Sequence, residues 1–280
     1  MDDFLMKLSA EVGSRTMTII GIDCATIASK TGLTLAEYDE AILRIKDCRI
    51  ADSKVPVAEQ IYGWIQTAER ALLAMDAPLG WPSPMGRALA EHKAGAPIAI
   101  KANDLFRRYT DEVVRRTPGK SPLEVGADRI ARTARTALSF LADLGVLVGK
   151  SIPLAWKARI DRGIYAIEVY PAGTLRVHQR MGTVVGSANT DEKKRSLLNK
   201  MSESGTLRFE NEKDTAIANE HVLDSVLCAA SAVEFLEERV IFPRTENERD
   251  LAQKEGWIWV RDAAGSERNT QRVLGLRCPN

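Results

Sequence analysis

The chain has 280 residues, which is enough for one large hydrophobic core or two modest ones. Its 39 lysines and arginines nearly balance its 38 aspartates and glutamates, so the overall charge gives no reason to expect binding to nucleic acid. Any such affinity has to come from a local basic patch. No apolar run approaches the roughly 18 residues that span a bilayer, so we expect no membrane partner.

The four cysteines are scattered without a CxxC pair, and no signal peptide is visible. This usage favours reduced thiols in a cytoplasmic protein. Residues 1–16 are interpreted as a leader and residues 263–280 as a polar C-terminal tail. Residues 17–262 are expected to form one domain.

Residues 17–38 (MTIIGIDCATIASKTGLTLAEY) predict a buried strand, a turn of small residues and a second strand running back. Residues 41–50 predict a third strand, which completes an antiparallel meander. Asp23 stands at the end of the first strand, where a buried carboxylate is costly unless something binds it.

Residues 56–70 begin with a proline and keep the apolar spacing of a helix. Residues 71–77 then predict a short apolar strand with Asp76 at its end, and the sequence Pro-Leu-Gly-Trp-Pro forces a turn directly afterwards. A second predicted strand therefore also ends in an acid.

From residue 83 to about residue 162 the pattern indicates almost continuous helix, which we interpret as a helical insertion that caps the domain. Residues 164–170 predict the next strand, with Glu168 near its end. A mixed region follows, in which residues 191–195 are expected to form a charged turn.

Asn219 is a candidate N-cap for a helix that runs to about residue 238 and carries an apolar stripe suited to packing on a sheet. Residues 257–260 predict one more short strand. The order of these elements, a meander followed by parallel strands joined through helices, is the ribonuclease H-like arrangement. We therefore predict an α/β fold: a mixed five-stranded sheet flanked by helices, with the long helical insertion between the fourth and fifth strands.

Four acids and one histidine fall on the elements that this topology brings together. Asp23 and Asp76 end neighbouring strands, Glu168 lies on the next strand, and His221 and Asp224 share one face at the start of the last helix. Carboxylates crowded in this way repel each other, and Mg²⁺ or Mn²⁺ relieves the repulsion because both ions prefer oxygen ligands. We predict that the four acids bind such ions and that His221 assists proton transfer.

Each of these residues also has a structural interpretation. An aspartate at a strand end is often a turn or cap residue, and Asp224 alone suits the first turn of a helix. Glu168 fits the surface of an edge strand, and His221 fits the exposed start of a helix. The coincidence of all of them on converging elements is what favours a shared metal site.

The segments GIDCA, AMDAPLGWP, FRRYTDEVVR, GADRIARTA, IEVYPA and HVLDSVLCAASA, in this order, resemble domain-of-unknown-function family 429. The resemblance extends over residues 18–260. Members of that family are predicted nucleases with a ribonuclease H-like fold, akin to Holliday-junction resolvases. The resemblance implies that Asp23, Asp76, Glu168 and Asp224 are the family's acidic positions, and that His221 matches a residue one helical turn before the last of them.

Residues 101–135 carry nine basic residues against five acidic ones in a chain that is otherwise nearly neutral. A basic cap above a metal site would hold phosphates near the ions. Ion-paired residues on a solvated helix face are the alternative. The candidates for nucleic-acid binding are Arg107, Arg108, Arg129, Arg132 and Arg135.

Two other features are not interpreted as sites. The segment GVLVGKS has one residue too few between its glycines for a phosphate-binding loop, and it follows a predicted helix and not a strand. His92 and His178 have no partner at ligand spacing, which favours surface or structural roles.

The sequence thus predicts a nuclease that hydrolyses phosphodiester bonds of DNA or RNA by a two-metal mechanism, and it leaves a homo-oligomer open. One alternative is an ATP-dependent phosphotransferase of the actin and sugar-kinase branch, since a similar first hairpin opens those folds. The other is a non-catalytic binding or scaffold protein on the same fold.

Overall fold

The computed structural model describes residues 16–126, 128–182 and 190–263 of the chain. The expected leader and tail therefore lie outside the described residues, apart from the one residue where each meets the domain. Within the described ranges, no helix combines the length and the apolar character needed to cross a bilayer.

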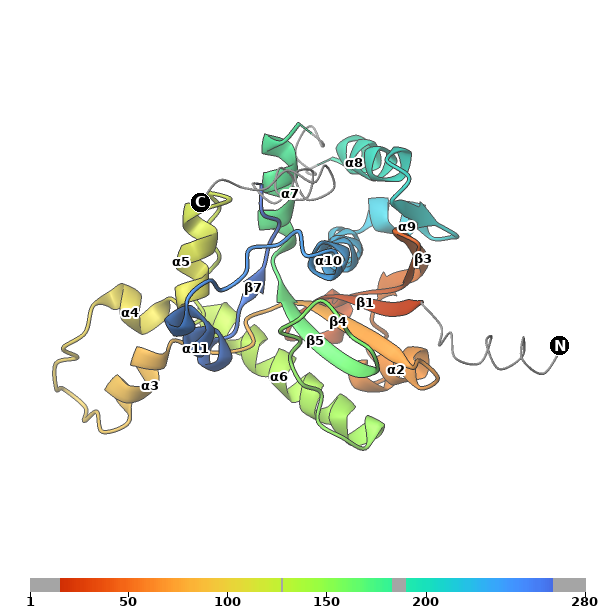
Figure 1. Ribbon diagram of the computed structural model, residues 1–280. Helices are drawn as coiled ribbons and strands as arrows, with labels where there is room; N and C mark the ends of the chain where they lie inside the picture. Colours follow the sequence, from red (N-terminus) through yellow and green to blue (C-terminus); the bar gives the residue numbers. More distant parts are fainter. Residues whose placement is uncertain (1–15, 127, 183–189, 264–280) are drawn as a thin grey trace, which may run out of the picture.

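A mixed seven-stranded sheet forms the centre of the described part of the chain (Figure 1). Its strands are β1 (Met17–Asp23), β2 (Gly32–Asp39), β3 (Ile42–Ile50), β4 (Arg70–Asp76), β5 (Gly163–Val169), β6 (Leu207–Phe209) and β7 (Ile258–Trp259). They lie in the order β6-β3-β2-β1-β4-β5-β7.

The five strands of the predicted sheet are all present, and they occupy consecutive places in this sheet. The further short strand predicted at residues 257–260 is present as β7. β1, β2 and β3 form the antiparallel meander, while β4 and β5 continue parallel to β1. The expected number of five strands is wrong because two short segments lengthen the edges. β6 pairs with β3 and β7 pairs with β5, both in parallel.

Helices cover both faces of the sheet (Figure 1). α10 (Glu220–Leu236) packs across β1 and β2 on one face, and α2 (Val57–Ile65) and α6 (Asp128–Val148) pack together on the other. Side chains alternate between the two faces along each strand. Ile19 and Leu72 accordingly belong to the core under α10, whereas their neighbours Ile20 and Leu73 belong to the core under α2 and α6.

The insertion between β4 and β5 is less helical than expected. It holds α3 (Ser83–Leu89), α4 (Ala102–Phe106), α5 (Tyr109–Arg116) and α6. Residues 90–101, 117–126 and 149–162 are not helical, because prolines and glycines interrupt each of these stretches. α3 and α5 contact α11 (Glu246–Glu255), and these helices gather at one end of the sheet (Figure 1).

The region between β5 and α10 contains three helices, α7 (Pro171–Arg180), α8 (Asp191–Glu203) and α9 (Lys213–Ala218). The charged turn predicted at residues 191–195 is wrong, because these residues form the first turns of α8. The side chain of Thr190 caps this helix by accepting a hydrogen bond from the Lys193 amide. Asp191 and Glu192 follow at the positive end of the helix dipole.

The first turns of α10 lie directly against β1 and β2 because two glycines leave room for the helix backbone. A Cβ at Gly21 would overlap the Ser225 carbonyl oxygen, and a Cβ at Gly32 would overlap the carbonyl oxygen of His221. The hydroxyls of Thr34 and Ser225 add a buried hydrogen bond of 2.7 Å between β2 and α10. The start of α10 is thus fixed beside the end of β1.

Candidate functional site

Two of the predicted site residues, Asp23 and Asp76, are direct neighbours in the sheet. β1 and β4 run parallel, and their register pairs Asp23 with Asp76 at the last position of both strands. Paired residues on neighbouring strands project from the same face of a sheet. The alternation of core residues along β1 and β4 places both carboxylates on the face that α10 covers.

α10 brings His221 and Asp224 to the same place. The Asn219 side chain caps this helix by accepting hydrogen bonds from the backbone amides of His221 and Val222. The His221 ring nitrogen Nδ1 lies 2.7 Å from Oδ2 of Asp23, although the two residues are 198 positions apart in the chain. The predicted convergence of the first strand, the fourth strand and the last helix is therefore present.

All three aspartates have raised pKa values. Burial is the main cause of the raised pKa of Asp76, and the negative charges of Asp23, Asp224 and Glu168 add to it. The pKa of Asp224 rises to about 7, again mainly through burial and then through the charge of Asp23. Burial also raises the pKa of Asp23, against the opposing effect of the hydrogen bond to His221. The three carboxylates thus share a region with too little positive charge.

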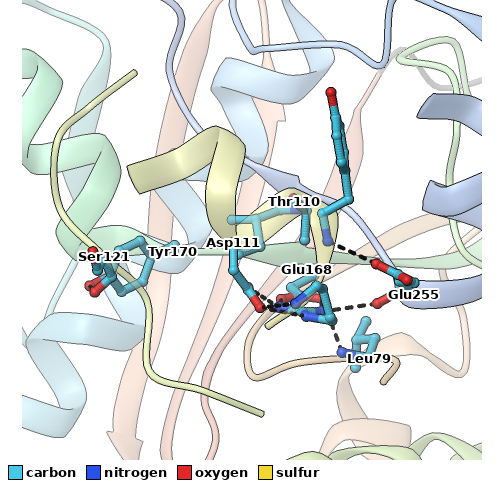
Figure 2. A network of polar contacts seen from close by, with 10 residues as sticks. Leu79, Thr110, Asp111, Ser121, Glu168, Tyr170 and Glu255 are labelled. Atoms are coloured by element: carbon cyan, nitrogen blue, oxygen red, sulfur yellow. Dashed lines mark hydrogen bonds and ion pairs between the residues drawn. The ribbon is translucent and has the colours of Figure 1, made fainter. Parts of the chain in front are cut away.

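Two further residues stand close to this cluster, and sequence reasoning did not assign them to it. The positive charge of Lys120, from the segment between α5 and α6, lowers the pKa values of both Asp76 and Asp224. Tyr170, directly after β5, donates a hydrogen bond of 3.4 Å to the Ser121 carbonyl oxygen (Figure 2). Burial and the charge of Asp76 raise the pKa of the Tyr170 hydroxyl to about 12. The sequence feature that could have indicated a role for Lys120 is its position in the net basic segment, residues 101–135.

Glu168 pairs with Arg108 and lies apart from the aspartate cluster. Both of its carboxylate oxygens accept hydrogen bonds of 2.7 Å from the Arg108 guanidinium, and one oxygen also accepts from the Leu79 amide at 3.0 Å (Figure 2). The register explains this orientation, because Glu168 pairs with Met75 and not with Asp76. One step along a strand moves a side chain to the opposite face. Glu168 therefore binds Arg108 and does not join the three aspartates under α10.

Arg108 is the centre of a buried charge network with an exposed fraction of only 1%. Besides Glu168 it binds Asp111 at 2.8 Å and the Glu255 carbonyl oxygen at 3.2 Å. Burial alone would lower the pKa of Arg108, but the adjacent carboxylates of Glu168 and Asp111 raise it overall. This arginine was expected to contact nucleic acid. In the structure it is buried and paired, so it is not available to a phosphate group.

The same network holds the turn that follows Asp76. Glu168 binds the amide of Leu79 (Figure 2). The carboxylate of Glu255 binds the amides of Ser83 and Tyr109 at 2.8 Å each. Buried, charge-assisted hydrogen bonds to backbone amides fix the path of a loop. The network therefore ties the turn after Asp76 to β5, to the start of α5 and to α11.

The other candidate arginines differ in exposure. Arg107 is half-buried and pairs with Glu124 at 2.9 Å. Three exposed arginines follow one another at a spacing of three residues near the start of α6, and none of them forms an ion pair with another described residue. They are Arg129, Arg132 and Arg135.

The chemistry of the aspartate cluster suits a hard divalent cation, since it offers carboxylate oxygens that lack enough compensating charge. In their present orientations, however, no three His, Cys, Asp or Glu side chains among the described residues are grouped closely enough to hold a metal ion. Cys24, beside Asp23, is free, and burial together with the nearby acids raises the pKa of its thiol well above the usual value. It is therefore poorly suited to be a nucleophile.

These observations define a mixed α/β protein with a cluster of three aspartates and one histidine at the ends of two parallel strands and the start of the covering helix. The chain belongs to the family described as protein of unknown function DUF429, whose family model matches residues 21–248. The match includes all four residues of the cluster. Neither the curated proteins nor the solved structures contain a match to the chain.

Proposed function

We propose that this protein is a nuclease of the ribonuclease H-like superfamily that hydrolyses phosphodiester bonds with the help of Mg²⁺ or Mn²⁺. The observation that carries the proposal is the register of β1 and β4, which pairs Asp23 with Asp76, together with the bond between His221 and Asp23. The strand order β3-β2-β1-β4-β5, an antiparallel meander continued by parallel strands, supports the proposed ribonuclease H-like arrangement.

Asp23, Asp76 and Asp224 are the residues that would hold the metal. A bound divalent ion supplies an activated water and stabilises the leaving oxygen of a phosphodiester. Glu168 is assigned a different role from the one expected from the sequence. Because both of its oxygens bind Arg108, it acts as a positioning residue that holds the turn after Asp76.

Three groups of residues would act on the substrate and its protons. Nδ1 of His221 lies in hydrogen-bond contact with Asp23, and the partly exposed ring would assist proton transfer to or from the substrate. Lys120 carries positive charge to the edge of the aspartate cluster and suits a phosphate oxygen. The arginines of α6 lie on an exposed helix face where they can bind the nucleic-acid backbone.

Cleavage assays with labelled DNA, RNA and branched DNA in Mn²⁺ or Mg²⁺ test this proposal. We expect the wild-type chain to cleave at least one of these substrates, and we expect EDTA, Asp23→Asn or Asp76→Asn each to reduce the rate at least about 100-fold, since each removes groups on which the transition state depends. Asp250→Asn, an exposed aspartate of α11, is the matched control and should keep the wild-type rate.

Titration of Mn²⁺ by calorimetry completes the test. The wild-type chain should bind the ion, and Asp23→Asn should bind it at least about tenfold more weakly, because carboxylate ligands set the affinity for hard cations. Cleavage that persists in EDTA or in Asp23→Asn would contradict the proposed mechanism.

A second candidate function is a nucleic-acid-binding protein without catalysis. This candidate is supported by the positions of the possible ligands: among the described residues, no three His, Cys, Asp or Glu side chains lie close enough together to hold a metal ion. Binding of DNA or RNA that depends on Arg129, Arg132 and Arg135, without cleavage and without Mn²⁺ binding, would favour this candidate. The phosphotransferase alternative stays a prediction, and thermal stabilisation by ATP is the measurement that tests it.

A further inference from the structure

A cavity of about 280 Å³ lies between α7, α8, α10, the edge strand β6 and its neighbour β3, away from the aspartate cluster. Two helices line it with complete stripes at the spacing i, i+3, i+4, i+7. Pro171, Thr174, Leu175 and His178 form the stripe of α7, and Leu227, Ala230, Ser231 and Glu234 form the stripe of α10. Residues at this spacing share one face of a helix, so the two helices face each other across the cavity.

Most of the cavity wall is apolar. Leu43 of β3 and Leu207 of β6 are buried at its floor, and Met201 of α8 lines it as well. Facing helices in a protein interior normally interdigitate to a density that leaves few voids larger than a water molecule. A space of this size lies close to the lower end of the range of pockets that bind small molecules.

One end of the cavity is polar and already organised. Glu234 accepts hydrogen bonds from His178 at 3.1 Å and from Arg239 at 2.7 Å, and it also pairs with Arg261. These contacts outweigh the effect of burial and lower the pKa of Glu234 to about 2. The carboxylate is therefore ionised at neutral pH and fixes both arginines at the rim of the cavity.

Three cations line the cavity, Lys200, Arg239 and Arg261. Arg239 and Arg261 pair with Glu234, which also lines the cavity, and Arg239 pairs with Glu237 as well. Lys200 is half-buried and forms no ion pair with another described residue. Lys200 thus places a positive charge, without a carboxylate partner among the described residues, beside an apolar cavity.

A buried hydroxyl provides a second, independent indication of a ligand. The Thr174 hydroxyl oxygen is buried and has no hydrogen-bond partner in the described structure. A hydroxyl on a helix usually bonds to the carbonyl four residues earlier, as Ser231 does across the cavity with the Leu227 carbonyl at 2.9 Å. Orphaned buried hydroxyls are uncommon because they cost free energy. Thr174 is therefore placed to donate to a ligand.

We propose that this cavity binds a small amphipathic carboxylate, with an apolar chain or ring between the two helices and an anionic head beside Lys200 and Thr174. The apolar wall accounts for the body of such a ligand, and the unbalanced lysine accounts for its charge. The proposal is independent of the nuclease activity, because none of the residues that line the cavity belongs to the aspartate cluster.

Three probes of equal chain length test the charge and the shape of the ligand. Isothermal titration calorimetry with the full chain should show one site for decanoate, weaker binding of decanol by at least about tenfold, and no binding of decyltrimethylammonium, since a buried like charge next to Lys200 is unfavourable. Equal binding of all three probes would overturn the proposal, because it would indicate a non-specific apolar surface.

Variants locate the binding. Ala230→Trp fills the cavity from α10 and should abolish decanoate binding, while Lys200→Gln should weaken it about tenfold, as expected for one lost ion pair worth about 1.4 kcal/mol. Lys54→Gln, at an exposed lysine far from the cavity in the chain, is the matched control and should bind as the wild type does. Decanoate affinity unchanged by Lys200→Gln and by Ala230→Trp would overturn the site. If circular dichroism shows that Ala230→Trp does not fold, the affinity of Lys200→Gln for decanoate and the comparison of the three probes still test the proposed site.

Discussion

Two acids on the same helix are in opposite electrostatic situations. Asp224, in the second turn of α10, has its pKa raised to about 7. Glu234, near the end of the helix, has its pKa lowered to about 2. The helix dipole alone predicts the reverse, because it stabilises negative charge at the start of a helix and destabilises it at the end.

The side chains around each acid explain the difference. Glu234 is surrounded by His178, Arg239 and Arg261, which offset the cost of its burial. Asp224 is also buried, but its nearest charges include two other carboxylates, Asp23 and Glu220. Local partners therefore decide the charge state, and the helix dipole contributes little by comparison. A buried acid with matched cations stabilises a fold, whereas a buried acid among other acids is typical of a site that binds something.

Removal of the matched acid should have the largest effect on stability. Glu234→Ala leaves Arg239 and Arg261 beside a buried space without their carboxylate, and breaking a buried ion pair from one side costs about 3–5 kcal/mol. Urea denaturation should show this loss in the free energy of unfolding. Glu203→Ala, at an exposed position of α8, is the comparison and should change it by less than about 0.5 kcal/mol. Equal effects of the two substitutions would contradict the comparison.

The crowded acids should respond to metal in a way that Glu234 does not. If Asp23, Asp76 and Asp224 hold Mn²⁺, then Mn²⁺ at about 100 times its dissociation constant should raise the free energy of unfolding by about 2.7 kcal/mol. Thermal denaturation with and without Mn²⁺ measures the shift. Asp23→Asn should lose most of it, and Glu234→Gln should keep it. A stabilisation of the same size in Asp23→Asn would show that Mn²⁺ binds at a site that does not include Asp23.

The two acids should also give opposite dependences of stability on pH. Glu234 stabilises the fold above its unfolded pKa of 4.5, and this contribution is lost as the pH falls towards about 2. Asp224 contributes stability below its unfolded pKa of 3.8, and that contribution is lost as the pH rises through about 7.

Urea denaturation in EDTA from pH 3 to pH 8 measures both dependences. Asp224→Asn should flatten the profile between pH 4 and 7, and Glu234→Gln should flatten it below pH 4.5. A single substitution that removes both dependences would show that the two ends of α10 do not titrate separately.

The smallest expected effect is a gain in stability. In EDTA at pH 8, Asp76→Asn replaces a buried carboxyl group beside Asp23 with a neutral amide, so the free energy of unfolding should rise by about 1 kcal/mol. Asp250→Asn, an exposed position, should leave it within about 0.5 kcal/mol. Urea denaturation checks both. A loss of stability in Asp76→Asn would mean that this carboxylate has a compensating partner.

Local patterns were sufficient for the elements that carry the aspartate cluster. The apolar runs that end in Asp23 and Asp76 predicted β1 and β4, and Asn219 marked the start of α10. Residues 191–203 were missed as a helix because their sequence is mostly polar, although Thr190 gave a readable cap signal. β6 was not predicted, because three residues are too few for a periodic pattern to be recognised. β7 falls within the short strand that was predicted at residues 257–260.

The placement of Glu168 could not be predicted in the same way. Its spacing from the end of β5 resembled that of Asp76 from the end of β4, but its face depends on the register between the two strands, which no local pattern specifies. Its partner Arg108 lies 60 residues earlier in the chain. For the same reason, Arg108 resembled its exposed neighbours on the basic insertion when only composition was considered.

The contact between His221 and Asp23 joins positions 198 residues apart and has a consequence for the assembly of the protein. Contacts of such long sequence separation form late, because a large loop must close before they can contribute. During synthesis, β1 and β4 can pair as soon as both have left the ribosome, but α10 emerges about 150 residues after β4. A nascent chain therefore has Asp23 and Asp76 in place with no helix above them, and the cluster of three aspartates and one histidine is complete only when α10 docks.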